Sequence, residues 1–121
     1  LHNTMIANNL LGENCFTLGT GAIISTGYNL SSDGSCSLSN EGDLDDTDPL
    51  LLALDNYGGP TPTHKLSFRS PAINAGTDRQ CPSFDQRGVS RPQGDGCDIG
   101  AFEYDTSPQL LHLPVARKSA P

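Results

Sequence analysis

Apolar side chains near the start of the chain come in two short runs that each contain asparagine. Residues 3–9 and residues 21–29 align at a spacing of 18 residues, with Ile6 opposite Ile24. In a parallel β-helix each turn contributes a short strand whose apolar side chains stack inward, and asparagine at the bends hydrogen-bonds along the stack. The pattern predicts two rungs of such a coil, and a β-sandwich containing the same runs is the alternative.

The rest of the pattern is less regular. Residues 31–48 form an acidic loop, and residues 50–54 are an apolar run too short to distinguish a strand from a helical turn by periodicity. Two Gly/Pro-rich turns follow at residues 57–63. The last expected strand is residues 98–104, with Ile99, Ala101 and Glu103 on one face and Gly100, Phe102 and Tyr104 on the other.

Composition favours an all-β, loop-rich fold. The apolar fraction is 35%, and 13 glycines, nine prolines and eight asparagines leave no stretch suited to a helical bundle. No run approaches the roughly 20 apolar residues that cross a bilayer, so no membrane span is expected.

The net charge of −7 is unevenly placed along the chain. Residues 1–64 contain eight acids and neither Lys nor Arg, and so sum to −8, whereas residues 65–121 sum to +1. Nucleic-acid binding needs clustered Lys and Arg, and anionic membranes attract basic segments. The acidic half therefore argues against both partners, and a solvated acidic surface that aids solubility is the simpler interpretation.

Four cysteines allow three disulfide pairings. No C-x-x-C motif occurs and the three histidines are scattered, so the spacing of a zinc site is absent. Chain order favours Cys15–Cys36 and Cys81–Cys97, each closing a loop of about 20 residues and stabilising the fold by about 3 kcal/mol. Such bonds place the protein outside the cytosol, secreted or at the cell surface. Four unpaired buried thiols are the alternative.

Six motifs follow one another in order along the chain. They are Asn-Leu-Ser-Ser-Asp-Gly-Ser-Cys (29–36), Thr-Asp-Pro-Leu-Leu (47–51), Asp-Asn-Tyr-Gly-Gly-Pro-Thr-Pro-Thr-His (55–64), Ser-Pro-Ala-Ile-Asn-Ala-Gly (70–76), Asp-Gln-Arg-Gly-Val-Ser-Arg-Pro (85–92) and Cys-Asp-Ile-Gly-Ala-Phe-Glu (97–103). Together, over residues 3–104, they resemble the choice-of-anchor Q domain of bacterial surface and secreted proteins. The chain departs from that family by inserting Tyr57 into the Asp-Asn-Gly-Gly-Pro turn.

The resemblance implies the C-terminal rungs of a right-handed parallel β-helix with a loop-rich, disulfide-tied cap, and no known enzymatic activity. Residues 1–30 would be the terminal rungs, residues 31–104 the cap, and residues 105–121 a linker and sorting tail without the Leu-Pro-x-Thr-Gly of sortase substrates. The first 11 residues lack the features of a signal peptide, so we expect a piece of a longer exported precursor. The upstream β-helix of the same polypeptide is then the expected partner, with cell-envelope or glycan components as further candidates.

Several polar residues are candidates for chemistry. Asp43, Asp45, Asp46 and Asp48 could supply oxygen ligands to calcium, the one cofactor the sequence suggests, although the loop lacks EF-hand spacing. An Asx turn at Asp48-Pro49 is the alternative explanation.

A second group of polar residues lies near the end of the chain. Asp85, Arg87, Arg91 and Asp98 allow a lyase-like basic site, but an ion pair of Arg87 with Asp85 or Asp98 that holds the loops together is the favoured interpretation. His64 and Glu103 are expected to be structural, since no nucleophile motif accompanies the histidine.

These observations predict a non-enzymatic capping and surface-display module of an exported β-helix protein. Because the last rung of such a coil exposes unpaired N–H and C=O groups, a folded end segment would prevent edge-to-edge association. The alternatives are the end of a glycan-binding or polysaccharide-lyase-like β-helix, and a calcium-dependent adhesin module.

Overall fold

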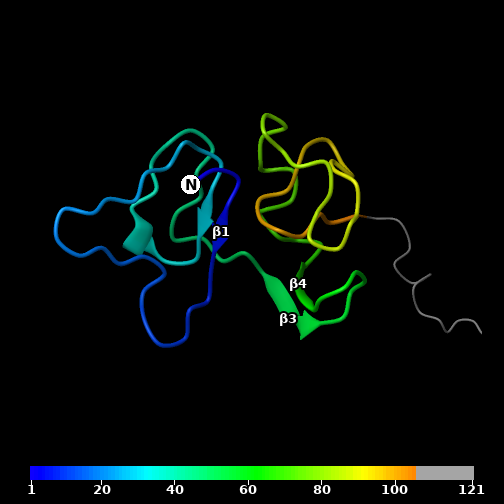
Figure 1. The fold of residues 1–121 in the computed structure, drawn as a ribbon, viewed down its shortest axis with the longest axis horizontal. Helices are drawn as coiled ribbons and strands as arrows, with labels where there is room; N and C mark the ends of the chain where they lie inside the picture. The colour runs from blue at the N-terminus through cyan, green and yellow to red at the C-terminus, as the bar shows by residue number, and fades with distance from the viewer. Residues whose placement is uncertain (106–121) are drawn as a thin grey trace, which may run out of the picture.

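The computed structural model describes residues 1–105, which form two small sheets, one 3-10 turn and many loops (Figure 1). The predicted all-β, loop-rich class is confirmed, whereas the right-handed parallel β-helix stays a prediction. The expected sorting tail, from residue 106 onwards, lies outside the described residues. The elements are β1 (Met5–Ile6), β2 (Leu30–Ser31), the 3-10 helix η1 (Gly34–Cys36), β3 (Leu51–Asp55) and β4 (Thr63–Leu66).

Residues 1–47 and residues 48–105, here called the N-terminal and C-terminal halves, lie side by side (Figure 1). Within residues 1–105, no helix is long and apolar enough to cross a membrane.

A short parallel ladder forms the centre of the N-terminal half. Met5 of β1 pairs with Leu30 of β2, and Leu44 forms a parallel bridge with Leu30. Leu30 donates its N–H to the Thr4 carbonyl, whereas Ser31 donates to Leu44, so β2 lies between the other two segments. The ladder thus stacks its apolar side chains in one column, formed by Met5, Leu30 and Leu44. Leu44 belongs to residues 31–104, the segment expected to form the cap.

The expected 18-residue repeat is wrong. Ile24 is 69% exposed and lies outside any strand, and the register is set instead by Asn29, which is buried. The Asn29 side chain accepts the Thr4 N–H at 2.9 Å and donates to the Leu1 carbonyl at 3.1 Å. This pairing satisfies buried backbone groups and brings Leu30, rather than Ile24, beside β1.

The apolar run at residues 50–54 becomes a strand of an antiparallel hairpin. β3 pairs with β4 through Leu51 and Leu66, with an irregularity before Leu54 meets His64. The turn of the hairpin includes Gly59, whose φ is +81° and whose added Cβ would lie 2.6 Å from the Arg87 Cα. A glycine is therefore required where the hairpin packs against residue 87.

One hydrophobic core joins the two halves. Leu30 packs with Leu66, Ala72, Ile99 and Phe102, all buried. A smaller cluster contains Cys15, Cys36 and Leu38, with Ile6 and Ile23 packed against it. Because Met5 and Ile6 point to opposite faces of β1, the ladder contributes to both clusters.

Both predicted disulfides are present. Cys15–Cys36 and Cys81–Cys97 are each bonded, and no cysteine among the described residues is free.

The strand expected at residues 98–104 is absent. Ile99, Phe102 and Glu103 are buried while Ala101 is exposed, so the predicted alternation of faces is also wrong. Gly100 has a φ of +101°, which turns the chain, and successive N–H groups bond to different parts of the molecule. Ile99 donates to Ala72, Gly100 to Asn3, and Glu103 to Asp85.

Candidate functional site

The two halves are held together at the first residues of the chain. The Asn3 side chain and the Thr77 backbone exchange two hydrogen bonds, of 2.9 and 3.0 Å, and the Gly100 N–H donates to the Asn3 carbonyl at 3.1 Å. We call the contact of Asn3, Thr77 and Gly100 the Asn3 junction. Gly100 also lies against Met5, since an added Cβ would be 3.2 Å from the Met5 Cβ.

Five charged side chains are buried close to this junction. We call them the ionic cluster: Asp85, Arg87, Arg91, Asp98 and Glu103. Its first pair is Arg87 and Asp85, 2.9 Å apart, with side chains 2% and 0% exposed. Arg87 also donates to the Glu103 carbonyl at 2.7 Å, and its guanidinium lies 3.6 Å from the centre of the Phe102 ring. The ion pair, the hydrogen bonds and the ring contact together hold the loop 85–91 against residues 102–103.

The second pair of the ionic cluster is Arg91 and Glu103. Arg91 Nε lies 3.2 Å from Glu103 Oε1, and the Arg91 guanidinium donates to the Gly100 carbonyl. Glu103 also accepts the N–H groups of Gln93 and Asp98. The pair therefore holds Gly100 in the position from which it reaches Asn3.

The carboxyls of the ionic cluster differ in their pKa values. Burial opposes ionisation of Asp85, but three backbone N–H groups and the Arg87 guanidinium outweigh it and lower its pKa. Burial raises the pKa of Asp98 and of Glu103, whose bonded N–H groups compensate only in part. The donors to these carboxylates are backbone and side-chain groups of the protein itself, so the cluster holds the surrounding loops in position.

Two of the four aspartates predicted as calcium ligands accept hydrogen bonds in different parts of the fold. Asp43 accepts hydrogen bonds from Ser25, Asn29 and Asn40, which together outweigh burial and lower its pKa. Asp48 caps the turn by accepting the Leu50 N–H at 2.9 Å.

Asp45 and Asp46 are not gathered with them into one site. Within residues 1–105, no group of three or more His, Cys, Asp or Glu side chains is arranged to hold a metal ion. Calcium binding at this loop stays a prediction.

His64 lies on the exposed side of β4, with Nδ1 2.9 Å from the Leu52 carbonyl across the hairpin. The residues that sequence reasoning missed as site residues are Asn3, Asn29 and Thr77. The sequence carried a signal for the two asparagines. Each lies next to a short apolar run, and asparagines in such positions can hydrogen-bond along a stack of strands. Their partners are distant in sequence, and the run pattern alone does not identify them.

Fold and site together define a small, disulfide-bonded protein of short strands and long loops. A buried ionic cluster holds the loop 85–91 against residues 98–103. Comparison with protein-family models, with curated proteins and with solved structures found no match to this chain. The resemblance to the choice-of-anchor Q domain therefore stays a prediction.

Proposed function

We propose that the chain is a non-catalytic capping and display module of an exported protein built on stacked strands. The observation that carries this proposal is the Asn3 junction, through which the C-terminal half folds back onto β1. An uncovered strand edge presents unpaired N–H and C=O groups that attract other chains. The fold-back of residues 48–105 covers part of that edge and buries the apolar column of the ladder.

The position of this contact differs from the cap expected from the sequence. The cap was expected at the last strand of a coil, whereas the Asn3 junction lies at the first strand, β1. Beyond Asn3, Met5 and Ala7 line an open, largely apolar cavity of about 220 Å³. A preceding strand of the same polypeptide would have to join β1 where the C-terminal half leaves that strand uncovered.

Secretion is part of the proposal. Two disulfides and the absence of a membrane-spanning helix among residues 1–105 are consistent with an extracellular protein. Display at the cell envelope would depend on residues beyond 105, as the family resemblance implies.

Gly100→Ala tests the capping role. An alanine here meets Met5 and must adopt a φ of +101°, so the Asn3 junction should open and expose the apolar column. The variant should self-associate in size-exclusion chromatography with light scattering.

Gly58→Ala is the matched control. Its φ is +107°, but an added Cβ meets nothing within 4 Å, so it carries the backbone strain without opening the junction. If Gly100→Ala stays monomeric, or if both variants associate equally, the capping proposal fails.

A further inference from the structure

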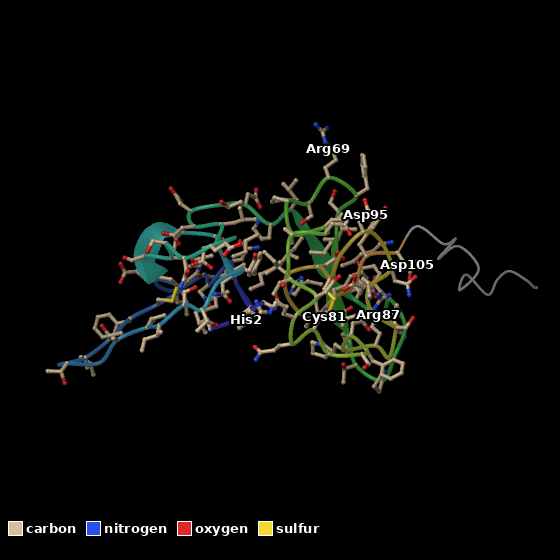
Figure 2. All side chains as sticks on the ribbon, turned by 90° about the horizontal axis from the view of Figure 1, so that it is seen from above. His2, Arg69, Cys81, Arg87, Asp95 and Asp105 are labelled. Atoms are coloured by element: carbon tan, nitrogen blue, oxygen red, sulfur yellow. A yellow bond between two sulfur atoms is a disulfide. The ribbon has the colours of Figure 1, made fainter. Side chains whose placement is uncertain are left out.

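A polar cavity of about 660 Å³ lies between the two halves of the molecule. His2, Tyr28 and Glu41 line it from the N-terminal half, and Arg79 and Gln80 line it from the C-terminal half. Figure 2 shows His2 where the two halves meet. The volume falls within the range of roughly 300–1,000 Å³ typical of small-molecule sites.

The ring of Tyr28 is held in place by several independent contacts. Its backbone has a φ of +62°, which is uncommon for a bulky residue. The ring lies against Gly42, where an added Cβ would be 2.3 Å from Cδ1, and the edge of the His2 ring approaches it at 6.3 Å between centroids. The hydroxyl donates to Glu41 Oε2 at 2.8 Å. The chain thus presents a fixed aromatic wall to the cavity.

The cavity is also lined by polar groups that make no hydrogen bond within residues 1–105. Among residues 1–105, neither the Arg79 guanidinium nor the Gln80 carboxamide makes a hydrogen bond, and Glu41 Oε1 makes none either. A guanidinium offers a fork of N–H donors, and a carboxamide or carboxylate offers acceptors side by side. Such planar groups suit pairs of adjacent hydroxyls.

The charges of the lining balance. Glu41 brings one negative charge and Arg79 one positive charge, so neither an anionic nor a cationic ligand is favoured by net charge. Residues 1–64, which sum to −8 and include His2, Tyr28 and Glu41 of the lining, further disfavour a polyanion.

We propose that this cavity binds one neutral sugar unit of a glycan. The apolar face of the sugar packs on Tyr28, and adjacent hydroxyls bond to Arg79, Gln80 and the free oxygen of Glu41. Thr77 of the Asn3 junction also lines the cavity, but the groups assigned to the sugar, Tyr28, Glu41, Arg79 and Gln80, belong neither to that junction nor to the ionic cluster, so the two roles can be tested separately.

The test uses the full chain labelled with ¹⁵N and titrated with maltotriose, cellotriose and mannotriose. Trigalacturonate and glycylglycine serve as anionic and zwitterionic probes. We expect at least one neutral trisaccharide to shift the amide signals of Tyr28, Glu41 and Arg79, and Arg79→Met to weaken its binding about tenfold.

Arg69→Met is the matched control, since Arg69 is exposed on the C-terminal half, far from His2 (Figure 2). Glu41→Gln is a second variant that keeps an acceptor for the Tyr28 hydroxyl. Equal weakening by the two arginine variants, stronger binding of trigalacturonate or glycylglycine, or no response to the neutral trisaccharides would each overturn the proposal. A retained Gly100→Ala phenotype alongside absent sugar binding would leave capping intact and reject this site alone.

Discussion

Asp98 and Glu103 are buried carboxyls whose ionisation should make the stability of the fold depend on pH. Both carboxyls are buried beside the Asn3 junction, and burial raises the pKa of each. A raised folded-state pKa gives stability that is present below the unfolded value, about 4, and is lost as pH rises through the folded value. Asp85 has the opposite sign, because its lowered pKa gives stability that is lost in acid.

The unfolding free energy should therefore pass through a maximum at mildly acidic pH. From neutral pH downward it should first rise as Glu103 and Asp98 take up protons, and then fall below about pH 4 as Asp85 and Asp43 are protonated. Glu103→Gln should remove much of the rise on the neutral side. Urea unfolding followed at a series of pH values measures both limbs.

The exposed Glu13→Gln provides the control for this prediction. It should leave the pH profile unchanged. A Glu103→Gln profile that keeps the full rise between neutral and mildly acidic pH would contradict the assignment.

At the residue scale the sequence predicts part of the site. The nearness of Arg87 to Asp85 follows from their spacing in a Gly-containing turn, and the structure places Arg87 against Asp85 and not Asp98. The role of Asn3 could not be predicted, because its partners lie 74 and 97 positions away. Contacts of that separation depend on the global fold rather than on local pattern.

At the scale of elements, each disulfide fixes a different part of the molecule. Cys15–Cys36 belongs to the smaller apolar cluster, at the base of the exposed loop that carries Phe16 and Leu18. Cys81–Cys97 lies beside Asp98 and brings the ionic cluster's segment close to Thr77. The two bonds close loops of similar length, with separations of 21 and 16 residues.

Removing either bond should lower the unfolding free energy by about 3 kcal/mol. The local effects should differ, and amide hydrogen exchange separates them. The double variant Cys81→Ser/Cys97→Ser should speed exchange at Gly100 and Glu103, because their loop loses its nearest covalent restraint. Cys15→Ser/Cys36→Ser should speed exchange around residues 14–38 and leave Gly100 protected. The opposite pattern would show that the closing segment does not depend on the second disulfide.

Features that depend on residues close together in the sequence were predicted, whereas features that depend on distant contacts were not. The cysteine pairs were predicted from chain order, and the hairpin turn from its Gly/Pro content. The strand at residues 98–104 was wrong because Gly100 turns the chain and each N–H finds its own distant partner. The 18-residue repeat failed because Asn29, a polar residue, sets the register that apolar periodicity was expected to set.

For the whole molecule, the shared core predicts a single cooperative unit. Leu30 of the ladder is 1% exposed and packs in the same cluster as Leu66, Ile99 and Phe102 of the C-terminal half. Neither half buries this cluster alone, and small chains have little apolar surface to spare. Leu30→Ala should therefore lower the unfolding free energy by about 2–5 kcal/mol in both halves together. Residue-resolved amide signals during urea unfolding measure this directly, with Tyr28 reporting on one half and Tyr57 on the other.

An exposed leucine gives the control for this last prediction. Leu11 lies in an open loop and is fully exposed, so Leu11→Ala should leave the midpoint in urea unchanged. In Leu30→Ala, the Tyr28 and Tyr57 signals should disappear at one common, lowered midpoint. If the Tyr28 signal is lost while the Tyr57 signal keeps its original midpoint, the halves are independent, and the C-terminal half would then be a separate domain rather than the closure of the strand ladder.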